Sequence, residues 1–351
     1  MKKVLTTLLA ISCLTGTLSG CLSSTGSSSQ IQTESSSSTV STQSDAKVIK
    51  VSFAGSENHP IMKTLLQFES MVEERTEGRY DIQLYPNGVL GDDLKATDQV
   101  KAGVLDAVVT SPSPIGSTVK EIMVFDLPYI FTSEEEADEV LAGPFADYLD
   151  EKMKESGLIN VAWYEDGFRH LTNSVRPVLT PDDVKGLKIR TMENPIHLAI
   201  WQKLGANPTP MAYTDVFTAL QQHVIDGQEN PFPSINDGKF QEVQKYLSTT
   251  GHVYSPFVFV FNPKTLDSIP EADRDIILQA AKDTEPINRK LNRDASKATR
   301  EEMEKSGLAI IDLSVEQKKA FQEILKPIWD EFTNIYGEDA LSQLKEALAA
   351  L

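Results

Sequence analysis

Short apolar runs alternate with longer amphipathic segments along most of the chain. Residues 48–53 form a β-like run, and Pro60 then opens a segment whose apolar positions recur at helical spacing until Gly78. Residues 80–84 alternate apolar and polar side chains, as a half-buried strand does. The same order continues with a helix at 92–102, a buried strand at 104–109, a helix opened by the capping box of Ser133 and Glu136, and a strand at 158–164. This alternation predicts an α/β domain with a largely parallel sheet and a ligand crevice at the carboxyl ends of its strands.

A second alternating set occupies the middle of the chain. Residues 187–190 are typical of a strand, Asn194 of an N-cap, Pro195 of a first helical residue, and Gly205 of a left-handed helix stop. Arg190 therefore stands at the carboxyl end of a strand and beside the amino end of a helix.

The last third of the chain has a different pattern. Residues 270–306 keep a helical period, interrupted only by Pro286, which would bend a continuous helix. Such a helix would be roughly 50 Å long at about 1.5 Å per residue, which exceeds one small lobe. We therefore expect it to brace two lobes, and the β-rich run at 252–261 would carry the chain back between them.

The amino-terminal segment has the features of a bacterial lipoprotein signal. Lys2 and Lys3 precede an uncharged, largely apolar run at 4–18, and a small-residue site ends at Cys21. Cleavage before Cys21 and acylation of its thiol would anchor the mature chain outside the membrane by lipid. An ordinary secretory peptide is the alternative, and the apolar run is shorter than the ~20 residues of a spanning helix. Residues 22–45 are mostly Ser, Thr, Gln and Gly, which is typical of a flexible tether.

Composition narrows the class of protein. Removing the targeting segment and tether from 351 residues leaves about 305, a natural size for two domains. The two cysteines, Cys13 and Cys21, both lie in the targeting segment, so no disulfide is expected in the fold. The formal net charge of −18 excludes a basic nucleic-acid surface, but it does not forbid an anionic ligand in a locally basic pocket.

Catalytic and metal-binding motifs are absent from the sequence. The five histidines show no paired spacing, and there is no G-x-S-x-G elbow, Walker loop or dinucleotide fingerprint. We therefore expect no enzyme, no cofactor and no metal site, with a secreted carbohydrate-acid-processing enzyme as the alternative of another class. Arg190 is the first candidate for binding, because a guanidinium at a strand end can hold a carboxylate by two parallel hydrogen bonds; a structural ion pair is the other interpretation.

Several stretches resemble a known family. They are Gly-Leu-Lys-Ile-Arg at 186–190, Leu-Gly-Ala-Asn-Pro-Thr-Pro-Met-Ala-Tyr at 204–213, Ala-Leu-Gln-Gln at 219–222 and Val-Ile-Asp-Gly-Gln-Glu-Asn-Pro at 224–231, with weaker likeness at 87–91, 167–173 and 240–246. Together they closely resemble the DctP-type solute-binding proteins of TRAP transporters. The resemblance implies a two-lobed α/β clamshell of the periplasmic-binding-protein type, which captures an organic acid outside the membrane and passes it to a sodium-driven permease. A binding protein of an ABC importer has the same general architecture, but segment 228–231 and the long helix resemble the TRAP type.

The resemblance also implies roles for individual residues. Arg190 matches the selectivity arginine that pairs with the ligand carboxylate, and Asn230 matches an asparagine that supports it. Arg169 matches a second pocket arginine, and Tyr213 falls where an aromatic ring packs on the ligand. Tyr213 could instead be a core residue at a helix entry, and Asn230 could merely shape the turn before Pro231.

Departures from the family pattern bear on the ligand. The loop at 110–114 lacks the acid and the arginine of sialic-acid binders, and Glu193 replaces their asparagine, which disfavours sialic acid. His223 stands where many members have Gly, so it must accept a left-handed turn.

Hydroxyl-binding groups are expected near the crevice. Glu57, Asn58 and His59 follow the first strand, and Glu193 offers the same chemistry from the second lobe. Each could instead cap a helix or lie in solvent. These groups favour a polyhydroxylated acid such as a hexuronate or aldonate, whereas a C4-dicarboxylate would require another cation.

The expected domain organisation follows from these elements. The signal peptide would span 1–20 and the tether 21–46. The first lobe would comprise 47–167 and about 255–290, and the second lobe 168–254 and about 291–351. The expected partners are a small carboxylate ligand, the TRAP permease and the lipid anchor, with no nucleic acid.

Overall fold

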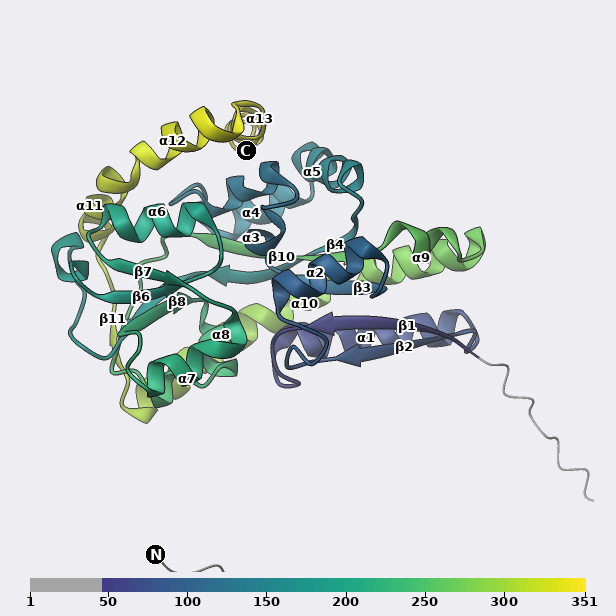
Figure 1. The fold of residues 1–351 in the computed structure, drawn as a ribbon, viewed down its shortest axis with the longest axis horizontal. Helices are drawn as coiled ribbons and strands as arrows, with labels where there is room; N and C mark the ends of the chain where they lie inside the picture. The colour runs from purple at the N-terminus through teal and green to yellow at the C-terminus, as the bar shows by residue number, and fades with distance from the viewer. Residues whose placement is uncertain (1–45) are drawn as a thin grey trace, which may run out of the picture. The chain divides into compact units, whose positions relative to one another are not determined.

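The first of two sheets contains the strands that frame one wall of the crevice. The computed structural model describes residues 46–351, so the predicted signal peptide, Cys21 and the tether lie outside the described residues. This sheet has the order β2-β1-β3-β10-β4, in which β1 pairs parallel with β2 and β3 while β10 runs antiparallel to β3 and β4 (Figure 1). Its strands are β1 (Lys47–Phe53), β2 (Tyr80–Tyr85), β3 (Ala107–Thr110), β4 (Ile159–Phe168) and β10 (Tyr254–Phe261).

One predicted strand is shorter than expected. The sequence predicts a buried strand from residue 104, but β3 begins at Ala107 and Val104 is 75% exposed. Gly103 ends the preceding helix in the left-handed conformation at φ 75°, and the chain needs residues 104–106 to turn back towards the sheet. The apolar side chain of Val104 therefore belongs to a turn.

The second sheet has the order β11-β9-β5-β8-β6-β7. Strand β6 pairs parallel with β7 and β8, whereas β5 is antiparallel to β8 and β9. The strands are β5 (His170–Asn173), β6 (Lys188–Thr191), β7 (Asn207–Pro210), β8 (Gly227–Asn230), β9 (Tyr246–Ser248) and β11 (Ala309–Ile311). We call the halves built on the first and second sheets lobe 1 and lobe 2.

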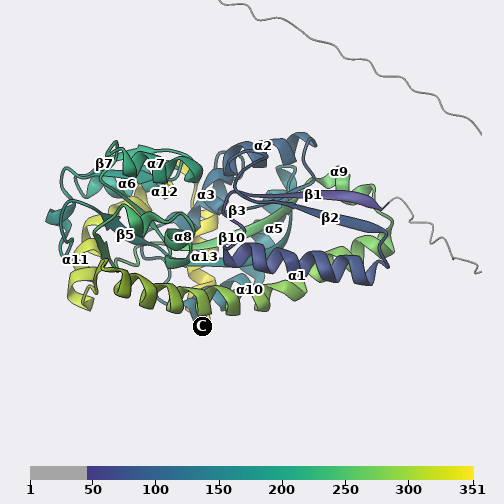
Figure 2. The ribbon, with the colours of Figure 1, turned by 90° about the horizontal axis from the view of Figure 1, so that it is seen from below.

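Helices cover both sheets (Figures 1 and 2). The α-helices are α1 (Pro60–Arg75), α2 (Asp93–Ala102), α3 (Pro112–Ile115), α4 (Glu134–Leu141), α5 (Pro144–Glu155), α6 (Pro195–Lys203), α7 (Val216–Gln221), α8 (Phe232–Asp237), α9 (Pro263–Asp267), α10 (Glu271–Ser306), α11 (Val315–Leu325), α12 (Pro327–Tyr336) and α13 (Asp339–Ala349). Short 3-10 helices lie at Lys120–Asp126, Pro181–Val184, Tyr213–Asp215 and Phe240–Glu242.

The predicted helix ends around the second set are present. The side chain of Asn194 accepts a hydrogen bond from the backbone N–H of Ile196 at 2.8 Å, and Pro195 is the first residue of α6. Gly205 has a φ of +81° just after α6, and His223 has a φ of +56° after α7. His223, which stands where many family members have Gly, therefore adopts the left-handed conformation expected at this turn.

Helix α10 extends beside both lobes. It continues through Pro286 for 36 residues and contacts α1 and β4 of lobe 1 as well as α8 and β11 of lobe 2 (Figure 2). Its Asn292 donates to the backbone oxygen of Asp166 at 2.9 Å, next to the place where the chain leaves the first sheet. The predicted two-lobed α/β fold with a bracing helix is confirmed.

The chain passes between the sheets at short connections. Arg169 is the single residue between β4 and β5, and residues 249–253 return the chain from β9 to β10. Gly167 and Gly251 have φ of +108° and +55° at these crossings, where a residue with a Cβ would be strained. The described residues, 46–351, belong to one compact unit in spite of the two sheets.

The carboxyl-terminal helices do not all pack on lobe 2. The sequence assigns about 291–351 to lobe 2, but α13 contacts α4 and α5. Leu341 and Leu344 are buried there in the same apolar cluster as Phe145 and Leu149, because burying this face removes it from water. The tail therefore returns to lobe 1 at its end.

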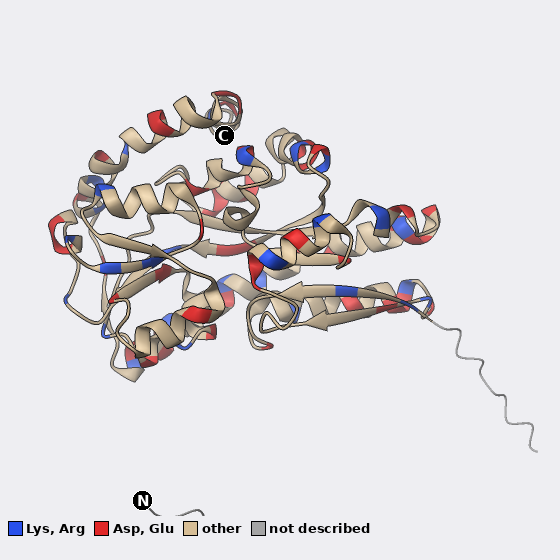
Figure 3. Ribbon diagram, in the orientation of Figure 1, with Lys and Arg blue, Asp and Glu red and all other residues tan. Residues whose placement is uncertain are grey.

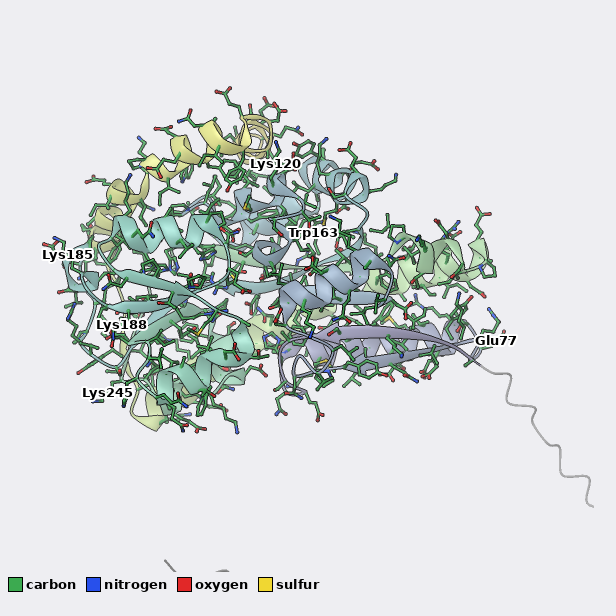
Figure 4. The ribbon with its side chains drawn as sticks, in the orientation of Figure 1. Glu77, Lys120, Trp163, Lys185, Lys188 and Lys245 are labelled. Atoms are coloured by element: carbon green, nitrogen blue, oxygen red, sulfur yellow. The ribbon has the colours of Figure 1, made fainter. Side chains whose placement is uncertain are left out.

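The interior and the surface are clearly separated. Trp163 of β4, labelled in Figure 4, is buried. It packs edge-on against Phe125 with 5.6 Å between ring centroids and donates its indole N–H to Asp150. Acidic residues are spread over the helices of both lobes (Figure 3). No helix among residues 46–351 combines the length and the apolar character needed to cross a membrane.

Candidate ligand-binding site

A small cavity of about 40 Å³ lies between the two lobes where several strands end. The parallel strands β1 and β3 of lobe 1 and β6 and β8 of lobe 2 direct their carboxyl ends towards it, as expected for an α/β crevice. Its lining residues are Phe53, Ala54, Gly55, His59, Asp93, Ser111, Asp166 and Phe257 from lobe 1, and Arg169, Arg190, Met192, Tyr213, Asn230 and Ser234 from lobe 2 or the crossing to it.

Arg190 is a buried cation without an ion pair among the described residues. It is the third residue of β6 and is only 3% exposed. Its Nε and Nη2 donate to the backbone oxygen of Met211 at 2.9 and 2.7 Å, and Nη1 makes no hydrogen bond within residues 46–351. Burial, with a smaller contribution from the Arg169 charge, lowers the pKa of Arg190 to about 10, although Glu229 acts in the opposite direction. The positive charge is therefore poorly compensated in the absence of a ligand.

Arg169, in contrast, is already neutralised by Glu229. Its Nε and Nη2 lie 2.6 and 3.0 Å from the two carboxylate oxygens of Glu229, and both side chains are at most 1% exposed. Burial alone would raise the pKa of Glu229, but Arg169 and His197 hold it well below its usual range. This pair fixes the second guanidinium at the wall of the cavity.

Two histidines complete the surroundings of Glu229. The His252 ring nitrogen Nε2 lies 3.0 Å from Glu229, and His197 reaches both Glu229 and, at 3.0 Å, Asp126. Despite its burial, the pKa of His197 is raised by Glu229 and Asp126, whereas burial lowers the pKa of His252. The buried carboxylate is thus satisfied from several sides, as a buried charge must be.

Asn230 has its amide oriented towards the cavity wall by two neighbours. Its Oδ1 accepts from Arg169 Nη2 at 2.9 Å, and its Nδ2 donates to Gln228 at 2.6 Å. The second hydrogen of Nδ2 has no acceptor among the residues that the structure describes. The amide is held in one orientation and retains a donor for a ligand oxygen.

Asp166 and His59 bring acceptors and donors from lobe 1. Ser234 of α8 donates to Asp166 at 2.8 Å, and His59 Nε2 lies 3.2 Å from the same Ser234 hydroxyl. Burial raises the pKa of Asp166 to about 7 in spite of the nearby Arg169, and burial lowers the pKa of His59 to about 4. His59 is also the N-cap of α1, because its Nδ1 accepts from the backbone of Ile61.

Asp93 lines the cavity although its sequence position did not predict this. Asp93 is the first residue of α2, and its Oδ1 is buried without a hydrogen-bond partner among residues 46–351. Burial raises its pKa to about 6, although Thr110 and the Arg190 charge stabilise the ionised form. Ser111, Asp166 and Ser234 were missed as well; only the position of Ser111 directly after a predicted strand could have indicated it.

Three of the predicted ligand contacts lie away from the cavity. Glu57, Asn58 and Glu193 are exposed and do not line it. They follow strand ends in the sequence, but their loops turn these side chains towards solvent. Arg190, Asn230, Arg169, Tyr213 and His59 are the predicted residues that the structure brings together.

A larger groove of about 730 Å³ borders the two crossings between the lobes. Lys297, Lys318 and Lys319 line it together with the ring of Phe232. We assign the ligand to the smaller cavity because the strand ends meet there and buried polar side chains face it. Residues 46–351 contain no group of three His, Cys, Asp or Glu side chains arranged to hold a metal ion.

The fold and site are those of a two-lobed binding protein with a basic residue at the centre of its cavity. Residues 51–335 match the family of bacterial extracellular solute-binding proteins, family 7, also called DctP. The chain belongs to this family, and it is a solute-binding protein of the TRAP type, not an enzyme. The family predicted from the sequence motifs is therefore confirmed.

Sequence similarity to individual solute-binding proteins supports the family assignment. A solute-binding protein of Verminephrobacter eiseniae is 40% identical over 281 residues, covering 80% of this chain and 83% of the relative. The 2,3-diketo-L-gulonate-binding periplasmic protein YiaO of Escherichia coli is 33% identical over 260 residues, covering 74% and 78%.

Solved structures give the same result. The sugar acid binding protein DctPAm of Advenella mimigardefordensis, in complex with galactonate, is 33% identical with a TM-score of 0.85 and covers 87% of this chain and 98% of its own. A TRAP solute-binding protein of Polaromonas bound to D-erythronate is 36% identical (TM-score 0.82; 85% and 98%). One of Sulfurospirillum deleyianum bound to succinate is 31% identical (TM-score 0.81; 85% and 98%).

Proposed function

We propose that this protein captures a hydroxylated monocarboxylate, such as a hexuronate or an aldonate, and delivers it to a TRAP permease. The observation that carries the proposal is the buried guanidinium of Arg190, which has no carboxylate partner within residues 46–351. A ligand carboxylate supplies the missing charge, and closing the cavity around it strengthens the attraction because water is removed. Arg169 lines the same cavity, and it and the free amide hydrogen of Asn230 are available to the same carboxylate.

The remaining cavity wall suits hydroxyl groups. Asp93 and Asp166 offer acceptors, Ser111 and Ser234 offer hydroxyls, and Tyr213 provides an aromatic face. Sugar hydroxyls donate to such acceptors and pack their carbon face on aromatic rings. Galactonate and D-erythronate, bound by the Advenella and Polaromonas proteins, are acids of this kind.

A C4-dicarboxylate is the second candidate, since the Sulfurospirillum protein was solved with succinate. In this chain, however, the second carboxylate would meet Asp93 and Asp166, and both arginines would already be used for the first. Like charges at close range in a dry cavity are costly. Dicarboxylates should therefore bind more weakly than sugar acids at neutral pH, and the difference should narrow as the pH falls below about 6, where Asp93 and Asp166 protonate.

A thermal-shift screen followed by calorimetry tests the proposal. The screen compares galactonate, gluconate, glucuronate, galacturonate and succinate, and ligand at 100 Kd should add about 2.7 kcal/mol of stability. Arg190→Ala should weaken the best ligand by roughly thirtyfold to several thousandfold, since truncating one partner of a buried charge pair costs about 2–5 kcal/mol. Arg190→Lys should lie between Ala and the parent because it keeps the charge and loses the fork.

A matched control is available on α1. Arg75 is an exposed arginine whose only ion pair is with Asp283 at the surface of the described residues, so Arg75→Ala should bind like the parent. Binding of Arg190→Ala within about threefold of the parent, in a folded protein, would refute the carboxylate clamp.

We further propose that acylated Cys21 holds the protein at the outer face of the membrane. The sequence motif before Cys21 supports this. Cys21→Ala should move the protein from the membrane fraction to the soluble fraction without changing ligand affinity. A variant that still sediments with membranes would contradict lipid anchoring.

A further inference from the structure

The two lobes are joined beside the cavity by the side chain of Asp237, the last residue of α8. Its Oδ2 accepts a hydrogen bond from the backbone N–H of Ser56 at 3.0 Å, and its Oδ1 accepts from the Ser56 hydroxyl at 2.5 Å. Ser56 lies in the loop between β1 and α1 of lobe 1, whereas α8 follows β8 of lobe 2. One carboxylate of lobe 2 therefore holds both the backbone and the side chain of a lobe 1 residue.

The same carboxylate is connected to the wall of the cavity. The Tyr213 hydroxyl lies 3.2 Å from Asp237 Oδ2 and 2.7 Å from the backbone oxygen of Ser234, also in α8. Tyr213 lines the cavity, and its ring packs edge-on against Phe240 at 5.6 Å. Burial and the nearby Asp237 and Asp166 charges raise the pKa of Tyr213 well above its usual value, so the phenol remains a donor.

The backbone next to Ser56 also lies close to Asp237. A Cβ placed on Gly55 would lie 3.1 Å from Asp237 Oδ2, a tight contact across the lobes, and 2.5 Å from the ring of Phe53 in its own lobe. Gly55 also lines the cavity. The loop of lobe 1 therefore lies next to the Asp237 carboxylate at Gly55 as well as at Ser56.

We propose that Asp237 is a latch between the lobes, which couples the contact of a ligand with Tyr213 to the closure of lobe 1 on Ser56. Separation of the lobes must break both Ser56 bonds, because their partners belong to different sheets. A ligand that packs on Tyr213 holds its hydroxyl against Asp237, and the carboxylate is then oriented to receive Ser56. Asp237 is a positioning residue in this scheme, since it reaches the ligand only through Tyr213.

The coupling to a ligand rests on the proposed function, but the latch itself does not. Asp237→Asn keeps the size of the side chain and replaces one acceptor oxygen by an NH₂ group, which faces a donor of Ser56 or Tyr213. Charge-assisted hydrogen bonds are roughly twice as strong as neutral ones, so the closed form loses stability relative to the open form. We expect about tenfold weaker sugar-acid binding, expressed mainly as faster dissociation.

Matched variants separate the latch from general damage. Asp215→Asn changes an exposed aspartate near Tyr213 for which no side-chain hydrogen bond or ion pair is present in the described part, and it should bind like the parent. Tyr213→Phe keeps the ring and removes only the hydroxyl, so it should weaken binding as Asp237→Asn does. Ser56→Ala combined with Asp237→Asn should weaken binding by clearly less than the product of the two single effects, because both changes break the same bonds.

The decisive readout is the distance between the lobes without ligand. In a full chain with Cys13 and Cys21 replaced by Ser, spin labels at Lys101 of lobe 1 and Gln221 of lobe 2 report this distance, since both positions are exposed. Asp237→Asn should shift the distribution towards longer distances, and Asp215→Asn should not. If the parent binds no sugar acid but Asp237→Asn still opens the lobes, the proposed ligand is wrong and the latch is right. If Asp237→Asn has the parent's distances and the parent's dissociation rate, the latch is refuted.

Discussion

The two cavity arginines should respond in opposite ways when their charges are removed from the unliganded protein. Arg169→Met leaves Glu229 buried without its bidentate partner, and only the histidines then remain near it. Breaking a buried ion pair from one side costs about 3–5 kcal/mol. We expect a loss of that size in the free energy of unfolding.

Arg190→Met should hardly lower the free energy of unfolding of the ligand-free protein. Burial lowers the pKa of Arg190 to about 10, which corresponds to about 3 kcal/mol of unfavourable burial of the charged form. The substitution also removes the two hydrogen bonds to Met211, which costs about 1–2 kcal/mol of stability because the net contribution of each bond is about 1 kcal/mol. The variant should therefore lie between unchanged and about 2 kcal/mol more stable than the parent.

Urea unfolding of the ligand-free proteins measures this contrast. The midpoint concentration should fall for Arg169→Met and should stay equal or rise for Arg190→Met, at a common slope. Arg75→Met serves as the surface control and should stay within about 0.5 kcal/mol. If Arg190→Met loses as much stability as Arg169→Met, then the charge of Arg190 is already compensated in the empty cavity, and the argument for a ligand carboxylate loses its basis.

Other outcomes follow from the same structure. The folded pKa of Asp166 is raised to about 7, so the native state binds an extra proton and its contribution makes stability fall as the pH rises from about 4 to about 7. Asp166→Asn should reduce the loss of stability between pH 5 and pH 8 in urea unfolding, while Asp93, with its pKa raised to about 6, keeps part of it. The same stability difference between variant and parent at both pH values would contradict this. Gly227→Ala should lower the melting temperature by several degrees, because its Cβ would lie 2.1 Å from the backbone oxygen of Thr172 across β5 and β8; a variant that melts with the parent would refute this contact. A hinge near 166–169 and 251–255 predicts that saturating sugar acid reduces the radius of gyration in X-ray scattering, and identical curves with and without ligand would count against closure.

The sequence predicts this fold well wherever a local pattern decides the structure. The caps at Asn194 and Gly205, the 36-residue α10 and the strand that carries Arg190 follow from side-chain period and turn chemistry within a few residues. Val104 is an exception, because an apolar pair beside Gly103 has the same local pattern in a turn as in a strand. The position of α13 on lobe 1 could not be predicted either, since an amphipathic helix does not encode which apolar surface covers it.

The site was predictable only in part, because a local sequence pattern does not encode which side chains the two lobes bring together. Arg190 and Asn230 stand at strand ends, and a sheet brings strand ends together. Asp93 is an acidic residue in the first turn of a helix, which is a common stabilising position, and nothing local distinguishes its buried role. Glu57 and Glu193 come shortly after strand ends, yet they face solvent. Which side of a loop faces the crevice is decided by how the two lobes meet.

The arrangement of charge in the cavity links binding to closure. Burying the Arg190 guanidinium without a partner charge is electrostatically unfavourable, and a ligand carboxylate that pairs with it would remove this cost. The ligand would therefore bind most tightly to the conformation in which the guanidinium is most deeply buried. A ligand can shift the equilibrium between open and closed forms only by its difference in affinity for the two forms. If Arg190 holds the ligand carboxylate, it supplies that difference from lobe 2, and the bonds of Asp237 to Ser56 join the lobes on the other side of the cavity wall. Removing Asp237 should therefore raise the ligand concentration needed for closure, while removing Arg190 should abolish the dependence of closure on the ligand carboxylate.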